Sequence, residues 1–130
     1  MQLDLVYSDD FKSEPTVIFS GETTPLVEFA KILRLLPTGR TVRLHLESLF
    51  NCHNIESLEL TIEENSLGMK QVKPMNFRWV ISREAAASYA HLVEVLAQSK
   101  SAAHQYLDLE NSEQIQIVVS KGEYPLGYFT

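Results

Sequence analysis

Four side chains that could carry chemistry occupy alternate positions near the C-terminal end of the sequence. The stretch AAHQYLDLEN, residues 102–111, places His104, Tyr106, Asp108 and Glu110 two residues apart. Side chains at i and i+2 of a β-strand point to the same face, so a strand here would present an imidazole, a phenol and two carboxylates together. Such a row could act in general acid–base catalysis, or it could form a polar contact surface.

The sequence NCHN, residues 51–54, joins a thiol to an imidazole. A structural zinc site takes about four protein ligands and a catalytic site about three, so Cys52 and His53 would have to recruit distant histidines. A nucleophilic pair of Cys52 with His45 is a further option, but nothing positions an oxyanion hole. The five glycines are scattered and form no phosphate-binding loop. We therefore expect no metal, no cofactor and no enzymatic activity.

The composition is typical of one globular domain, here residues 1–130. The chain has 45% hydrophobic and 22% charged residues, and it can bury a sizeable core. Its net charge of -6 disfavours nucleic acid and anionic membranes as partners and favours a basic protein. A lone cysteine, no signal peptide and no apolar run near the roughly 18 residues of a membrane span predict a cytoplasmic protein.

Alternating apolar and polar residues predict about seven strands, and two amphipathic stretches predict helices. Thr23 or Thr24 is expected to cap the first helix, which Pro37 and Gly39 end, and Ser82 is expected to cap the second. The apolar stripe of the second helix comprises Ala86, Tyr89, Ala90, Val93, Leu96 and Ala97. Residues 65–76 are expected to form a connector, and the strands to span 3–8, 16–20, 41–47, 57–64, 77–82, 103–110 and 115–120.

Two halves of the chain, about 16–64 and 77–120, repeat the order strand, helix, strand, strand. The repeat has an offset of 62 to 63 residues and aligns LHLE with LDLE. It predicts an α+β fold in two layers, with one largely antiparallel sheet of about seven strands and both helices on one of its faces. The other face of the sheet would then be open.

Strand parity places a set of polar side chains on that open face. If the leucines and isoleucines of the strands face the helices, the opposite face carries Arg43, His45, Glu59, His104, Tyr106, Asp108 and Glu110. This face is either an ordinary solvated surface or a protein-binding surface, in which Tyr106 is the aromatic anchor and carboxylates surround it. We take these seven residues as the candidate partner-binding site.

The segment FRWVIS, the Ala-rich helix after it and the sequence AHQYLDLENSEQIQIVVSKGEYP resemble the Imm32-type immunity proteins of bacterial polymorphic toxin systems. The likeness rests on His104, Tyr106 and Asp108, on the turn ENSEQ and on the final apolar strand. One departure is Gln105, where the family often has a second histidine. The resemblance implies a non-enzymatic protein that binds and blocks a cognate toxin, and many such toxins have basic clefts.

We therefore expect a non-enzymatic protein-binding domain, most concretely an immunity protein, that uses the open face and the adjoining loop 48–56. The alternatives are a structural or assembly module that forms a homodimer, or a small-ligand protein or enzyme that uses His45, His104 and Asp108.

Overall fold

The computed structural model describes residues 2–107 and 115–122, which form an α+β fold. Asp108 and Glu110 of the candidate site lie outside these residues. In chain order the elements are β1 (Leu3–Phe11), β2 (Glu14–Gly21), α1 (Thr23–Leu35), β3 (Thr41–Arg43), a 3-10 helix (Leu44–Leu46), β4 (Phe50–His53), β5 (Ser57–Glu63), β6 (Gly68–Lys73), β7 (Asn76–Ser82), α2 (Arg83–Ala97), β8 (Ala103–Tyr106) and β9 (Gln116–Lys121).

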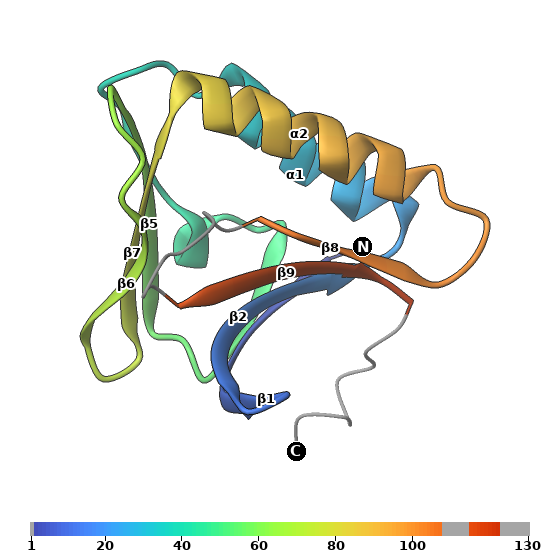
Figure 1. Ribbon diagram of the computed structural model, residues 1–130, viewed down its shortest axis with the longest axis horizontal. Coiled ribbons are helices and arrows are strands. Elements are labelled where there is room, and N and C mark those ends of the chain that lie inside the picture. The colour runs from blue at the N-terminus through green and yellow to red at the C-terminus, as the bar shows by residue number, and fades with distance from the viewer. Residues whose placement is uncertain (1, 108–114, 123–130) are drawn as a thin grey trace.

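The prediction of one sheet is wrong, because the described strands form two. A five-stranded sheet has the order β4-β1-β2-β9-β8, and a four-stranded sheet has the order β3-β5-β7-β6. Each sheet is mixed, with β2 parallel to β9 in the first and β5 parallel to β7 in the second. The helices explain the division, since α1 carries the chain from the five-stranded sheet to the other and α2 carries it back (Figure 1).

The same pairing scheme occurs twice. The hairpin β1–β2 is followed by α1 and by the antiparallel pair β3–β5, and the hairpin β6–β7 is followed by α2 and by the antiparallel pair β8–β9. The last strand of each half pairs with the hairpin of the other half. The two halves therefore exchange strands, which is why a repeat along the sequence produces two sheets instead of one.

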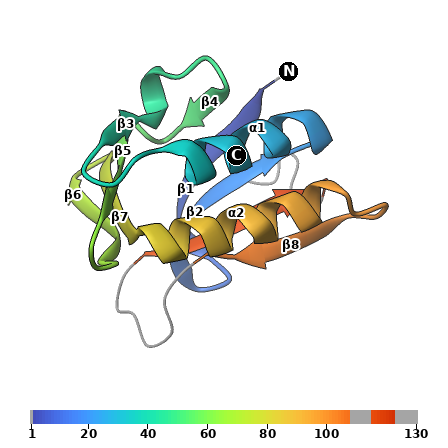
Figure 2. The ribbon, with the colours of Figure 1, turned by 90° about the horizontal axis from the view of Figure 1, so that it is seen from above.

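One hydrophobic core joins both sheets and both helices. The helices lie side by side over the five-stranded sheet, and the four-stranded sheet closes one end of the layer (Figures 1 and 2). Aromatic rings from all four parts meet at the centre, where Trp79 lies 5.8 Å from Phe19, 6.4 Å from Phe29 and 6.3 Å from Tyr89, measured between ring centroids. The stripe predicted for α2 is confirmed, because all six of its residues are buried.

The two helix starts differ from each other in their capping. Ser82 is the N-cap of α2 as predicted, and its hydroxyl accepts a hydrogen bond from the Ala85 amide at 3.0 Å. The expected threonine cap of α1 is wrong, because Glu22 is the N-cap residue and makes no capping bond through its side chain. The Thr23 hydroxyl instead donates to the carbonyl of Ala97 at the end of α2.

We expect Ser82→Ala to lower the free energy of unfolding by about 1 kcal/mol, because the Ala85 amide loses its acceptor. Thr24→Ala, at an exposed position in the first turn of α1, should change it by less than about 0.5 kcal/mol. Urea denaturation of both variants measures the difference. Equal losses would show that the Ser82 cap has no special role.

Three segments differ most from the predictions. The strand expected over 41–47 ends at Arg43, the loop 48–56 contains β4, and the connector 65–76 contains β6. After Arg43 the chain turns through the 3-10 helix, so that Leu44 is fully buried and Leu46 is 68% exposed. The His45 Nδ1 accepts a hydrogen bond from the Leu58 amide at 3.2 Å. This side-chain bond links the 3-10 helix to β5 just after the backbone pairing between β3 and β5 has ended.

Candidate functional site

The structure separates the predicted site residues between the two sheets. Arg43 and Glu59 lie directly opposite each other on the outer face of the four-stranded sheet, while His104 and Tyr106 belong to β8 at the edge of the five-stranded sheet. His45 lies in the 3-10 helix, and its imidazole is engaged with the backbone of β5. The expectation that these side chains share one sheet face is therefore wrong. It is wrong because the strands that were expected to form one sheet form two.

His104 and Tyr106 remain neighbours on β8. Their rings meet edge to face, with centroids 5.5 Å apart and an interplanar angle of 86°. Tyr106 is 40% exposed, and the strand next to it places the buried Val118 and Ser120 opposite this pair. This pair is an aromatic contact at a sheet edge, four strands away from β4.

Cys52 and His53 point to opposite sides of β4, because consecutive strand residues alternate. Cys52 packs against the main core, and burial raises the pKa of its thiol. The His53 Nε2 lies 3.5 Å from the carboxylate of Asp4 on the other side. Within residues 2–107 and 115–122, no group of three or more His, Cys, Asp or Glu side chains is placed to hold a metal. The thiol and the imidazole of NCHN cannot act as a pair in this arrangement.

Because the thiol pKa is raised above its ordinary value of 9.0, less thiolate is present at any pH below the shifted value. We expect Cys52 in the folded protein to react with iodoacetamide at pH 8 at least several-fold more slowly than it does in urea. The pH at which its reaction rate is half-maximal should also be higher in the folded protein. A faster reaction in the folded state would contradict this assignment.

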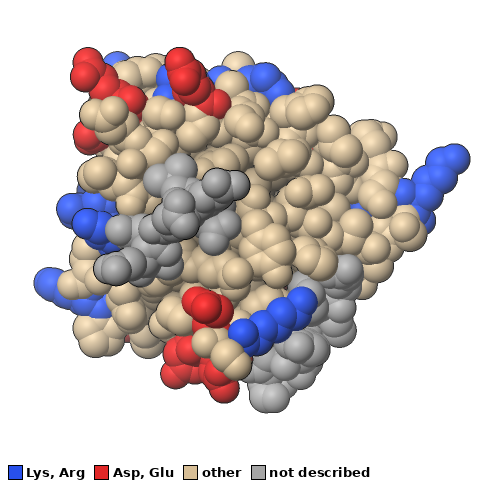
Figure 3. Space-filling model, in the orientation of Figure 1, with Lys and Arg blue, Asp and Glu red and all other residues tan. Residues whose placement is uncertain are grey.

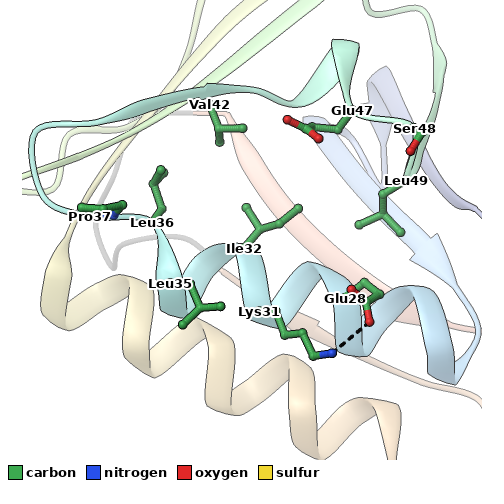
Figure 4. A pocket seen from close by; sticks show the side chains of 10 residues that line it. All are labelled: Glu28, Lys31, Ile32, Leu35, Leu36, Pro37, Val42, Glu47, Ser48 and Leu49. Atoms are coloured by element: carbon green, nitrogen blue, oxygen red, sulfur yellow. Dashed lines mark hydrogen bonds and ion pairs between the residues drawn. The ribbon is translucent and has the colours of Figure 1, made fainter.

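An open, largely apolar groove lies between α1 and the segment 42–49. It has a volume of about 700 Å³, and Figure 4 shows α1 as one wall and the segment as the other. Ile32, Val42 and Leu49 point toward the space between the walls. The lining residues are Glu28, Lys31, Ile32, Leu35, Leu36, Pro37, Val42, Glu47, Ser48 and Leu49.

The walls of the groove follow from the local sequence on each side. On α1, the residues Leu26, Phe29, Ala30 and Leu33 are buried in the core, whereas Ile32 and Leu35 lie on a second apolar row beside that stripe. On the other wall, the 3-10 helix turns the chain so that 47–49 passes beside α1. A straight strand over 41–47 would have left no second wall.

Leu35 is the most exposed large apolar side chain of this region, with 72% of its surface accessible. Ile32, Leu36, Val42 and Leu49 are half-buried. Together these side chains form an apolar row at the surface, which the apolar side chains of another chain could cover.

The polar rim of the groove is mostly acidic. Glu28 forms an ion pair with Lys31 at 3.1 Å on the same helix. Glu47 is exposed on the opposite wall, and no ion pair within the described part of the chain engages it. The groove thus offers an apolar floor with one uncompensated carboxylate at its edge.

The sequence-based reasoning missed this site, apart from expecting a contact at 48–56, which includes Ser48 and Leu49. The available signal was the apolar set Ile32, Leu35 and Leu36, whose i, i+3 and i+4 spacing forms a row beside the core stripe.

Comparison with known proteins does not extend this assignment. Neither a protein-family model, nor a curated protein, nor a solved structure matches the chain. Neither α1 nor α2 has the length and apolar character that a membrane-spanning helix requires. The groove and the charges of the surface are therefore the features that bear on function.

Proposed function

We propose that this chain is a non-enzymatic protein-binding domain that docks an amphipathic, basic helix of a partner protein in the groove between α1 and residues 42–49. The observation that carries the proposal is the open apolar groove with Leu35 exposed at its lip. Apolar surface left in water is a favourable site for another apolar surface, at about 25 cal/mol per Å² buried.

The dimensions of the groove fit a short helical segment. The wall from Glu28 to Leu35 runs for about 10 Å of helix axis, at 1.5 Å per residue. A partner helix with apolar residues at i, i+3 or i+4, and i+7 presents its anchors over about the same length. Such a helix would place two or three anchors against Ile32, Leu36 and Leu49.

The charge of the chain favours a basic partner over an acidic one. Glu47 stands at the rim without an ion-pair partner in the described part of the chain, and the whole chain has a net charge of -6. A lysine or arginine flanking the apolar face of the partner helix would meet Glu47. The negative field of the chain would also accelerate the encounter, since opposite charges steer association.

The resemblance to Imm32-type immunity proteins supports a more specific proposal, in which the chain is an immunity protein. In that proposal the partner is a toxin, and the chain neutralises it by occupying a basic surface that the toxin needs. The domain would then act by binding alone, without a catalytic step of its own.

Titration with a model ligand tests the docking proposal. The probe is an 18-residue helical peptide with leucines at i, i+3, i+4 and i+7 and lysines at the remaining positions. We expect Leu35→Gln to weaken its binding at least tenfold, because a buried leucine side chain contributes about 1.5–3 kcal/mol. Val95→Gln is the matched control, since Val95 is an exposed apolar residue, 54% accessible, on α2. It should change the affinity by less than twofold.

Three results would overturn the docking proposal. The first is an equal loss of affinity for the peptide in Leu35→Gln and Val95→Gln. The second is equal or tighter binding of the same peptide with glutamates in place of lysines. The third is a stable wild-type dimer in sedimentation that becomes monomeric in Leu35→Gln, because the groove would then be the interface of a homodimer.

The toxin-neutralising form has a separate test. We expect co-expression of the wild-type chain to restore growth to cells that produce the protein encoded by the neighbouring reading frame, and Leu35→Gln to fail. Failure of the wild-type chain, with peptide binding intact, would reject toxin neutralisation and leave the docking groove in place.

A further inference from the structure

The outer face of the four-stranded sheet carries three exposed cations on a protein that is negatively charged as a whole. Cross-strand pairing aligns Arg43 with Glu59, Glu59 with Arg78, and Arg78 with Lys70. These four residues, one from each strand, form what we call the cationic row. Figure 3 shows Lys and Arg gathered along the left margin of the molecule, over this sheet.

The three cations of the row are accessible to a partner. Arg43, Arg78 and Lys70 are exposed, and Glu59 is half-buried between two of them. No ion pair found among residues 2–107 and 115–122 includes any of the four. The inner face of the same strands carries Leu58, Leu60, Phe77 and Trp79, all at most 1% exposed, so the sheet presents its charges on a rigid, packed support.

We propose that the cationic row is a second protein-docking surface, separate from the groove, and that it binds a carboxylate-bearing helix of a partner protein. Neighbouring strands are about 4.8 Å apart, so Lys70 and Arg78 are separated by about 5 Å and Arg78 and Arg43 by about 10 Å. On a helix laid across the strands, residues at i, i+3, i+7 and i+10 advance by about 5, 10 and 15 Å. Glutamates at i, i+3 and i+10 meet the three cations, and a lysine at i+7 meets Glu59.

A protein carboxylate fits this row better than a nucleic-acid phosphate does. Glu59 stands between two of the cations and would repel a continuous line of phosphates. The outward residues of the four strands that the structure describes include no aromatic side chain, so bases would find no stacking platform. A single anion between Arg43 and Arg78 is a feature that a partner protein can match and a uniform polyanion cannot.

The test compares two helical peptides of the same composition by fluorescence titration in 50 mM salt. The ordered peptide carries Glu, Glu, Lys and Glu at i, i+3, i+7 and i+10, and the second carries the lysine at i instead. We expect the ordered peptide to bind at least tenfold more tightly. Arg78→Glu and Lys70→Glu, both at exposed positions, should each weaken its binding at least tenfold.

Lys100→Glu is the matched control, because it makes the same charge change at an exposed position outside the sheet. It should alter the affinity by less than twofold, and Leu35→Gln should leave this binding unchanged, which separates the row from the groove. Equal losses in Arg78→Glu and Lys100→Glu, equal binding of the two peptides, or no binding of the ordered peptide would each overturn the proposal. Tighter binding of a 12-nucleotide single strand at the same residues would also overturn it.

Discussion

Trp79→Ala is expected to lower the free energy of unfolding by about 3–5 kcal/mol, which removes much of the stability of a domain of this size. Trp79 is fully buried on the inner face of β7, and its ring stacks on Tyr89 and contacts rings from β2 and α1. Truncation leaves a cavity where both sheets and both helices meet. Urea denaturation followed by far-UV circular dichroism measures the loss.

Trp79→Phe provides the control for this prediction. The indole Nε1 is buried and has no hydrogen-bond partner among residues 2–107 and 115–122, so the tryptophan carries the cost of an unsatisfied donor. Phenylalanine removes that donor and keeps most of the apolar volume. We expect Trp79→Phe to cost less than about 1.5 kcal/mol. A loss as large as that of Trp79→Ala would show that the indole nitrogen has a partner in solution.

Arg83→Ala is expected to lower the free energy of unfolding by about 2–3 kcal/mol. Its guanidinium donates hydrogen bonds to the carbonyls of Leu33 and Leu36 at the C-terminal end of α1. These carbonyls belong to the last turn of the helix, where no intrahelical donor remains and where the helix dipole favours a cation. Hydrogen bonds to a charged group contribute about 1.5–3 kcal/mol.

Two further variants separate this effect from a general loss of surface charge. Arg83→Lys keeps the charge but not the forked donor, and it should recover about half of the loss. Arg34→Ala removes an ion pair with Glu94 that is 44% and 43% exposed at its two side chains, and it should cost less than about 1 kcal/mol. Equal losses of unfolding free energy in Arg83→Ala and Arg34→Ala would contradict the role of Arg83 in capping the C-terminal end of α1. Thermal denaturation of the four proteins in one buffer gives the comparison.

Local patterns predicted the elements whose residues carry a strong period. The six-residue stripe of α2, the cap at Ser82 and the alternation of β5 all follow from side-chain spacing within one segment. Such features depend on neighbours along the chain. They are therefore readable from the sequence before any tertiary contact is known.

The division into two sheets could not be predicted from patterns within single segments. The alternation of apolar and polar residues indicates that a strand has one buried face, but it does not indicate which strands pair with each other. The helices α1 and α2 move the chain between sheets, and the last strand of each half pairs with the hairpin of the other half. The sequence therefore predicted correctly that Arg43 and Glu59 lie on the face of their sheet that points away from the core. It did not predict that His104 and Tyr106 belong to the other sheet.

The groove depended on one local departure from the pattern. The sequence LHLE continues the alternation of β3 without a break, yet the chain leaves the strand at Leu44 and forms the 3-10 helix. The bond from the Leu58 amide to His45 is a tertiary contact between segments 13 residues apart, so no short window predicts it. The second wall of the groove, and with it the candidate site, follows from that turn.

The most direct test of the docking groove is a residue-by-residue map of the lysine-rich helical peptide on the ¹⁵N-labelled chain. The proposal predicts that amide resonances shift mainly in 27–37 and 42–49, and that the shifts saturate together with one dissociation constant. Resonances of α2 and of β6 should move little. A map centred on α2 or on the outer face of the four-stranded sheet would contradict the claim that the groove is the binding site.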